Sequence, residues 1–239
     1  SAGIVSPWEY ALAMIEVAVR NGTKLLRRSP VSAIRKKDGV FSLTVPGGTI
    51  ESRYVINAAG VYSEKIHNLI CQPRFHILPT RGEYYVLDKN EGNLVHSTIF
   101  QCPGKFGKGV LVTPTVDGNL LIGPNAEEVE EENRSCTAAG LHFVEESARR
   151  SVPGFQLGDA VRSFAGVRAN VDTDDFIIGE APDVPNFIDL AGIKSPGLSS
   201  AAAIGQEVVK ILRDKHDLPD RKKEYRDGRR HIRFRQLSP

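Results

Sequence analysis

The first regular pattern of apolar residues along the chain has the period of a helix. Four apolar residues recur at spacings of three and four, which places them on one helical face: Trp8, Leu12, Ile15 and Val19. Ser6, Pro7 and Glu9 match a capping box with proline in the first turn. Asn21-Gly22 supplies a left-handed stop, so the pattern predicts a helix that ends near Arg20.

Beyond this helix the chain breaks into short β-prone runs, which are typical of strands. Four runs predict a β-meander: residues 24–27, 31–35, 40–45 and 49–56. A second group predicts an antiparallel sheet: residues 83–87, 97–101, 109–113 and 119–122. Further strands are expected at 160–170 and 176–179, and further helices at 63–70, 136–151 and 199–213. These elements together predict an α+β fold.

Composition limits the class of protein. The chain has 239 residues, 41% hydrophobic and 25% charged, which is enough for a buried core in one large domain or two small ones. A formal net charge of +2 leaves no global excess to attract nucleic acid, and the composition excludes disorder and collagen. No apolar run approaches the roughly 20 residues of a membrane span and the N-terminus lacks a signal-peptide pattern, so we expect a cytoplasmic protein.

Cysteines and charged runs add little chemistry. Cys71, Cys102 and Cys136 cannot all pair and show no CxxC spacing, so we expect reduced thiols and no metal site. Residues 127–132 hold five glutamates, which predicts a solvated loop or a helix start. Residues 213–235 hold ten Lys/Arg against five Asp/Glu. We interpret this basic tail as a connector rather than as a nucleic-acid contact.

Two predicted strands end in small residues that let a ligand approach the backbone. Residues 54–56 lead into Asn57-Ala58-Ala59-Gly60 and then a helix, with a plain strand-to-helix turn as the alternative interpretation. The apolar strand at 188–191 leads into a small-residue loop and an Ala-rich helix that starts at Ser199 or Ser200. The unpaired N–H groups and positive dipole end of that helix suit an electron-rich ring edge, whereas a capped core helix is the alternative.

Seven segments of the chain together carry a family resemblance. They are GIVSP at 3–7, YVINAAGVYS at 54–63, LPTRGEYY at 78–85, LIGPN at 121–125, FAGVR at 164–168, DDFIIG at 174–179 and SPGLS at 195–199. In this order they resemble the FAD-dependent oxidoreductases of the D-amino-acid oxidase type, in the glycerol-3-phosphate dehydrogenase and L-2-hydroxyglutarate oxidase branch. The resemblance spans residues 3–213.

The resemblance implies an antiparallel-sheet substrate domain joined to the C-terminal part of an FAD/NAD(P)-binding α/β domain. It divides the chain into a partial FAD-binding domain at 1–73, a substrate-binding sheet at 74–162, a return to the FAD domain at 163–213, and a basic connector toward a further C-terminal domain at 214–239. The glycine-rich G-x-G-x-x-G turn that receives the FAD pyrophosphate in the family does not occur in these 239 residues. We therefore interpret the chain as a piece of a longer enzyme with little activity of its own.

FAD is the cofactor that the resemblance implies. Eight residues match positions that contact it in the family: Val31, Ala58, Ala59, Gly60, Ser195, Gly197, Leu198 and Ser199. Val31 matches a backbone contact to the adenine. Residues 195–199 match the segment beside the isoalloxazine, where N–H groups and a helix dipole stabilise negative charge on the reduced ring.

Two arginines are the candidates for binding the substrate. Arg168 matches the arginine that binds the anionic group of the substrate in relatives, and its forked guanidinium suits a carboxylate or phosphate. An ion pair with a carboxylate such as Asp174 is the alternative. Arg81 is a second candidate, with a structural ion pair as its alternative. We interpret His76 and His96 as structural histidines rather than general bases, and we assign no catalytic residue.

The implied reaction is hydride transfer to FAD from a small anionic secondary alcohol, either glycerol 3-phosphate or a 2-hydroxy acid. The electrons would pass to a quinone, another carrier or oxygen. We expect no nucleic-acid partner and no transmembrane segment, and peripheral contact with a membrane stays open. The alternatives are a non-enzymatic α+β module that binds an anionic small molecule or a partner protein, and an amine or amino-acid oxidase.

Overall fold

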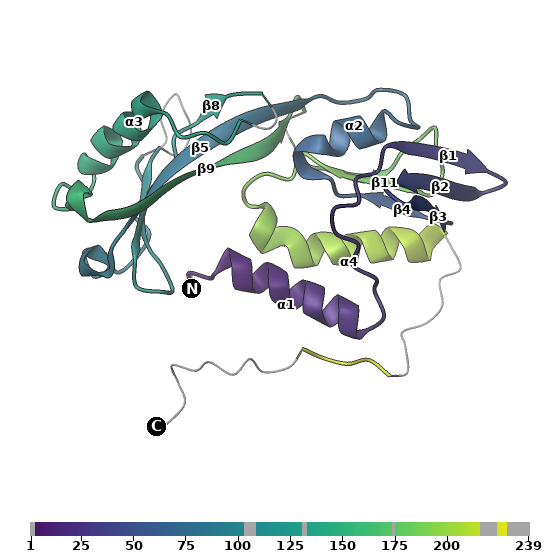
Figure 1. Cartoon of the computed structure of the whole chain (residues 1–239), viewed down its shortest axis with the longest axis horizontal. Coiled ribbons are helices and arrows are strands. Elements are labelled where there is room, and N and C mark those ends of the chain that lie inside the picture. Colours follow the sequence, from purple (N-terminus) through teal and green to yellow (C-terminus); the bar gives the residue numbers. More distant parts are fainter. Residues whose placement is uncertain (1–2, 103–108, 131–132, 174, 216–223, 229–239) are drawn as a thin grey trace.

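Two long strands run side by side through the middle of the molecule and connect its two ends (Figure 1). β5 (Ile77–Leu87) and β9 (Ala160–Val171) pair antiparallel, with Ile77 opposite Val171 and Leu87 opposite Ala160. The computed structural model describes residues 3–102, 109–130, 133–173, 175–215 and 224–228. Since β9 continues across the expected boundary between residues 162 and 163, the segments on either side of it share one strand.

One end of the molecule is an antiparallel sheet covered by a helix. β5 is bordered on one edge by β9 and on the other by two short strands, β7 (Leu120–Gly123) and β8 (Glu127–Glu128). A third short strand, β6 (Leu111–Pro114), pairs with β7 and extends the sheet. Helix α3 (Ala138–Arg149) packs Val144 and Ala148 onto this sheet. Their partners in the core are Leu87, Val95, Val110, Val112, Leu120, Ile122 and Phe155.

The other end contains two three-stranded sheets. The first is antiparallel: β1 (Ala33–Lys37), β2 (Val40–Val45) and β3 (Gly48–Ser52). The second has the order β10 (Ile177–Glu180), β11 (Phe187–Ala191), β4 (Val55–Asn57). A core of apolar side chains joins the two: Ile34, Phe41, Val55, Cys71, Ala181 and Phe187.

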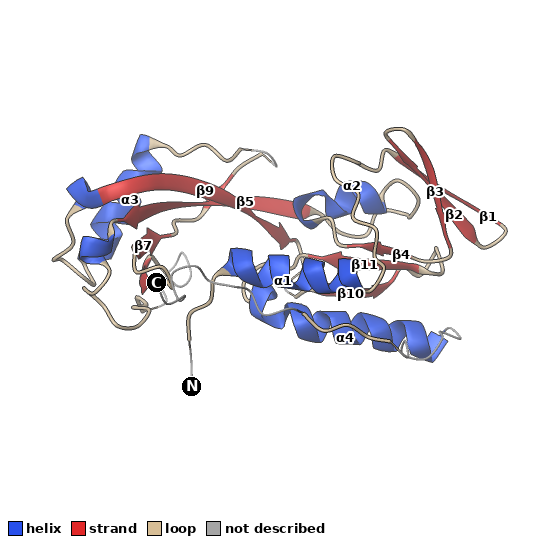
Figure 2. Cartoon of the chain, turned by 60° about the horizontal axis from the view of Figure 1, so that its bottom comes forward, coloured by secondary structure: helices blue, strands red, loops and turns tan. Residues whose placement is uncertain are grey.

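Three helices belong to this second end: α1 (Pro7–Arg20), α2 (Ser63–His67) and α4 (Gly197–Lys215). α1 and α4 lie next to each other below the sheets in Figure 1 and remain adjacent in the rotated view of Figure 2. Short 3₁₀ turns complete the connections: Gly60–Tyr62, Lys89–Glu91 and Leu157–Asp159. Among the described residues, no helix combines the length and the apolar character that crossing a bilayer requires.

The parallel pair in the second sheet places the two small-residue loops together. β4 and β11 pair in parallel, with Asn57 opposite Asp189, although 132 positions separate these residues in sequence. Parallel strands end at the same edge of a sheet, so the loops that follow β4 and β11 leave from one edge.

The first helix and the α+β class are confirmed. α1 spans Pro7–Arg20, and the Oγ of Ser6 accepts a hydrogen bond from the N–H of Glu9 at 3.3 Å, as a capping serine does. The predicted apolar face is present, but no residue of α1 is buried and Trp8 is 74% exposed.

Four predictions about strands and loops are wrong. Residues 24–27 form no strand, and residues 97–101 contribute only the isolated bridge between Ile99 and Val112. The run at 49–56 divides between β3 and β4, because the Oγ of Ser52 bonds the N–H and C=O of Tyr54 and interrupts the strand. Of the glutamate run, Glu127–Glu128 form β8, where Arg81 neutralises Glu127.

Candidate functional site

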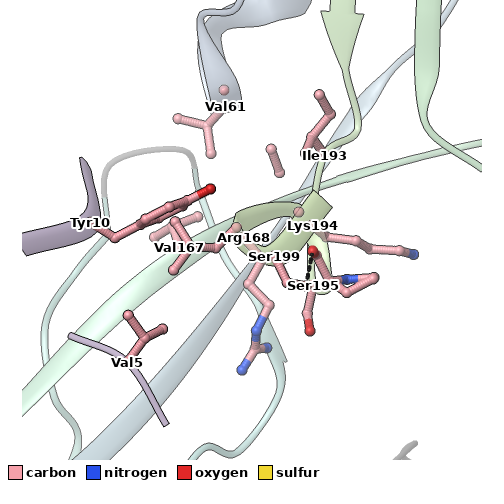
Figure 3. Close-up of a pocket in the computed structure, with 14 residues that line it drawn as sticks. Val5, Tyr10, Val61, Val167, Arg168, Ile193, Lys194, Ser195 and Ser199 are labelled. Atoms are coloured by element: carbon pink, nitrogen blue, oxygen red, sulfur yellow. Dashed lines mark hydrogen bonds between the residues drawn. The ribbon is translucent and has the colours of Figure 1, made fainter. Parts of the chain in front are cut away.

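The loops that follow β4 and β11 line one cavity of about 790 Å³ (Figure 3). Gly60 comes from the first loop, and residues 193–199 come from the second loop and the first turn of α4. Gly60 has φ +61°, in the left-handed region, and apart from its chain neighbours no atom lies within 4 Å of where a Cβ would stand. The expected bends near positions 60 and 197 therefore meet at one open space.

The bend before α4 is made tight by its own backbone. The helix begins at Gly197, which is two residues before Ser199, the earlier of the two expected starting positions. Gly197 donates a hydrogen bond to the carbonyl oxygen of Lys194, and the hydroxyls of Ser199 and Ser200 donate to the carbonyl of Pro196 at 2.9 Å. The first turn of α4 thus lies at the cavity wall, where the positive end of the helix dipole favours negative charge.

The structure groups most of the expected cofactor residues in this cavity. Its lining includes Gly60, Ser195, Gly197, Leu198 and Ser199, together with Val5 and Tyr10 from the N-terminal segment. Ala58 and Ala59 precede Gly60 in the same turn but do not line the cavity. Val31 packs against the core between the two sheets, apart from the cavity. The FAD-binding role of all eight residues stays a prediction.

Arg168 lies between this cavity and a second one of about 590 Å³. Ser195 also lines both cavities. The second cavity is largely apolar and lies over the antiparallel sheet, and its other members include Tyr84, Phe100, Leu111, Pro124, Asn125 and Phe143. Nη2 of Arg168 donates a hydrogen bond to the main-chain oxygen of Asn125 at 3.2 Å. Asp174, the expected alternative partner of Arg168, lies outside the described residues.

Arg81 occupies a different environment from Arg168. It is 2% exposed, and its Nη2 contacts Oε2 of Glu127 at 2.6 Å. Its Nη1 donates to Oδ1 of Asn133 at 3.2 Å, and its Nε lies 3.8 Å from Oε1 of Glu83. Arg81 lines neither of the two cavities, so the structure favours the structural ion pair over a direct substrate contact.

Neither candidate histidine reaches the cavities. The side chain of His76 is 70% exposed, and its Nδ1 lies 2.7 Å from Oε1 of Glu64. His96 is exposed as well. Their interpretation as structural histidines agrees with these positions.

A buried polar network, absent from the sequence-based expectations, lies directly beneath the Gly60 turn. Asn57 donates through Nδ2 to the carbonyl of Ser63 and to Oδ1 of Asp189, both at 2.8 Å. Oδ2 of Asp189 lies 2.7 Å from Nδ1 of His67, whose Nε2 lies 2.8 Å from the carbonyl oxygen of Gln72. Burial raises the pKa of the Asp189 carboxyl, while hydrogen bonding to Asn57 and the nearby His67 and Arg74 oppose the shift. The signal in the sequence was one charged residue inside the apolar run at 187–191.

A cavity bordered by small-residue turns, a helix N-terminus and one arginine is suited to a planar ring beside an anionic group, as in proteins that bind a ring cofactor. The family model described as FAD dependent oxidoreductase (DAO) matches residues 1–211, and the chain belongs to this family. FAD is thereby confirmed as the cofactor of the family to which the chain belongs. The described residues fit the ring of FAD, since Gly60 leaves its side of the cavity open and the first turn of α4 borders the same space.

The chain is similar to dehydrogenases and oxidases of known name. It is 47% identical over 240 residues to a glycerol 3-phosphate dehydrogenase of Caloramator mitchellensis, which covers 100% of this chain and 50% of the relative. It is 28% identical over 275 residues to the mitochondrial L-2-hydroxyglutarate dehydrogenase of Mus musculus, covering 90% of this chain and 59% of the relative. The FAD-bound, dithionite-reduced L-α-glycerophosphate oxidase of Mycoplasma pneumoniae matches with a TM-score of 0.80 and 31% identity, over 88% of this chain and 56% of that one. The chain thus spans about half the length of the curated relatives it matches.

Proposed function

We propose that this chain forms the flavin-facing and substrate-facing half of the active site of an enzyme that oxidises glycerol 3-phosphate. The observation that carries the proposal is the position of Arg168 at the rim of the cavity bordered by Gly60 and the start of α4. The relative at 47% identity is a glycerol 3-phosphate dehydrogenase, and a phosphate is a good partner for a forked guanidinium.

When bound, FAD supplies the acceptor for the hydride of the substrate's carbinol carbon. Arg168 binds the anionic group and thereby holds the substrate at the cavity. The N–H groups and dipole of the first turn of α4 stabilise negative charge at the adjacent ring edge. The turn at Gly60 allows the ring to approach the backbone because no side chain projects there. We assign no group to the removal of the hydroxyl proton.

The enzyme interpretation is favoured over the non-enzymatic binding module because the chain belongs to a family of FAD-dependent oxidoreductases. The same proposal includes transfer of the electrons from the flavin to a quinone, another carrier or oxygen. It also includes a cytoplasmic location for the enzyme. L-2-hydroxyglutarate is the second candidate substrate, since it also presents an anionic group to Arg168 and an L-2-hydroxyglutarate dehydrogenase matches 90% of the chain.

Anaerobic mixing of single substrates with the whole FAD-loaded enzyme that contains this chain tests the proposal. We expect glycerol 3-phosphate to abolish the visible absorbance of oxidised flavin faster than L-2-hydroxyglutarate, and glycine to leave it unchanged. Glycerol is the matched control that lacks the anionic group, and it should react far more slowly. Loss of absorbance with glycine alone would instead support the amino-acid oxidase alternative, and a whole enzyme that binds no FAD would refute the proposal.

A further inference from the structure

Another buried network lies behind Arg168, in the antiparallel sheet. Its centre is Glu83, which is on β5 and 0% exposed. Oε1 of Glu83 accepts hydrogen bonds from the N–H of Thr137 at 2.5 Å and from its hydroxyl at 3.1 Å. Oε2 of Glu83 accepts one from Nδ2 of Asn125 at 2.6 Å. All three donors thus point at one carboxylate that has no access to the cavities.

Asn125 is held by Glu83 through both ends of its amide. While Nδ2 donates to the carboxylate, Oδ1 accepts a hydrogen bond from the main-chain N–H of Glu83 at 2.7 Å. The main-chain oxygen of Asn125 in turn accepts the hydrogen bond from Nη2 of Arg168. Clamping the side chain fixes the peptide of Asn125, so the position of this acceptor depends on Glu83.

Two glycines leave room for this arrangement. A Cβ on Gly82 would overlap Nη2 of Arg168 and would come within 2.8 Å of the Cβ of Pro124. A Cβ on Gly140, in the first turn of α3, would overlap Oε2 of Glu83 and lie 2.8 Å from Nδ2 of Asn125. The guanidinium therefore lies against bare backbone on one side and is hydrogen-bonded to Asn125 on the other.

We propose that Glu83 and Asn125 are positioning residues that hold the guanidinium of Arg168 where it binds the anionic group of the substrate. The inference rests on the proposed role of Arg168. It gives both residues a role in substrate affinity, although Glu83 lines neither cavity. Because the anionic group is bound equally before and during hydride transfer, loss of this positioning raises KM and leaves kcat nearly unchanged.

Donor and acceptor chemistry gives a reciprocal test. In Glu83→Gln the new NH₂ group faces Nδ2 of Asn125, so two donors oppose each other. Turning the Asn125 amide by 180° removes this contact but places Nδ2 against the main-chain N–H of residue 83, which is also a donor. In Asn125→Asp two carboxylates face each other. The double variant restores every bond, because the amide introduced at position 83 keeps its oxygen toward Thr137 and donates an N–H to the new carboxylate at position 125.

The variants are compared in the FAD-loaded enzyme by KM and kcat for glycerol 3-phosphate and by competitive inhibition with inorganic phosphate. We expect each single variant to raise KM and the phosphate inhibition constant together by about tenfold, with kcat within about twofold. The double variant should return both constants to within about threefold of the wild type. Gly82→Ala, which crowds the guanidinium directly, should raise the same two constants and provides the measurement if a single variant does not fold.

Three results would overturn the inference. One is an unchanged phosphate constant in the folded single variants or in Gly82→Ala. Another is a folded double variant with no recovery of KM. The third is a loss confined to kcat or to flavin content, which is the signature of a structural role. Arg168→Ala separates the two proposals: if it raises KM while the single variants do not, only the positioning role fails, and if it has no effect, the proposed function fails as well.

Discussion

Each of the two sheets that border the site contains a buried carboxylate, and the two carboxylates have different surroundings. Glu83, in the antiparallel sheet, accepts hydrogen bonds from Thr137 and Asn125 and has Arg81 nearby at 3.8 Å. Asp189, in the sheet with the parallel pair, contacts Asn57 and His67, and burial raises the pKa of its carboxyl. The first network supports a charged side chain, Arg168, whereas the second supports a backbone turn.

This difference suits the two ligands that the networks face. An anionic substrate group needs a cation at a defined position. Glu83 and nearby Arg81 have opposite charges, so this pair can hold Arg168 through Asn125 without adding a net charge of its own. A planar ring needs an unobstructed wall, so the second network only has to keep the Gly60 turn in place. Variants that affect one ligand and not the other test this division.

The largest effect is expected for Arg168→Ala. Loss of the guanidinium should raise KM for glycerol 3-phosphate about 100-fold and leave FAD affinity unchanged, because a buried or half-buried charge pair contributes roughly 2–5 kcal/mol to binding. Arg168→Lys should recover part of the affinity but not all, since an ammonium lacks the forked geometry. Steady-state kinetics and flavin titration measure the two constants, and a change in FAD affinity equal to that in KM would contradict the division.

Gly60→Ala should produce the converse pattern. At φ +61° an alanine is strained, and its methyl group would project into the open cavity, so we expect FAD affinity to fall about tenfold with little change in substrate KM. Gly39→Ala is a matched control, because Gly39 also has positive φ, +81°, and open space, but lies in the turn between β1 and β2. If both variants weaken FAD binding equally, backbone strain rather than the cavity wall is responsible.

Local patterns predicted the helices and loops of the site but not its supporting networks. The cap at Ser6 and the turns near 60 and 197 were predictable because their signals lie within a few residues of the feature itself. The division of the run at 49–56 was not, since a single hydroxyl at Ser52 decides it. Nor was the parallel pairing of β4 with β11, which joins residues more than 130 positions apart.

The two arginines show the same limit at the level of single residues. Both lie within long strands, Arg81 in β5 and Arg168 in β9, and no local feature shows which side chains surround them. Their roles are decided by partners 43–52 positions away, namely Glu127 and Asn133 for Arg81 and the carbonyl of Asn125 for Arg168. Only tertiary structure brings those segments together, so the sequence could place Arg168 first by resemblance but could not show the ion pair that occupies Arg81.

A smaller effect, on stability rather than binding, is expected for Asp189→Asn. An asparagine at this position can still accept from Nδ2 of Asn57 and has the size of the aspartate that it replaces, so the variant keeps the network close to its wild-type form without a buried carboxylate. The raised pKa of Asp189 means that the folded wild type holds this proton more tightly than the unfolded chain. Wild-type stability therefore falls as pH rises from the ordinary aspartate value of 3.8 through the raised value.

The variant lacks this titration, so its free energy of unfolding should exceed that of the wild type by an amount that grows through the same pH window and reaches about 1 kcal/mol. Denaturant titrations of both proteins at a series of pH values measure the difference. An advantage that shrinks as pH rises would mean that ionised Asp189 is a net stabiliser of the turn, and the two networks would then be alike.

The smallest effect is expected at Cys71, which reports on opening of the second network. Its N–H donates to the carbonyl of His67, and burial, with Asp183 and Asp189 nearby, raises the pKa of its thiol to about 12. Because the thiolate is the reactive form, iodoacetamide should modify exposed Cys102 in the native protein and reach Cys71 only after unfolding. Mass spectrometry of the labelled peptides gives the order of reaction. Rapid native labelling of Cys71 would show that this region opens in the folded protein, in which case the Gly60 turn could not serve as a fixed wall.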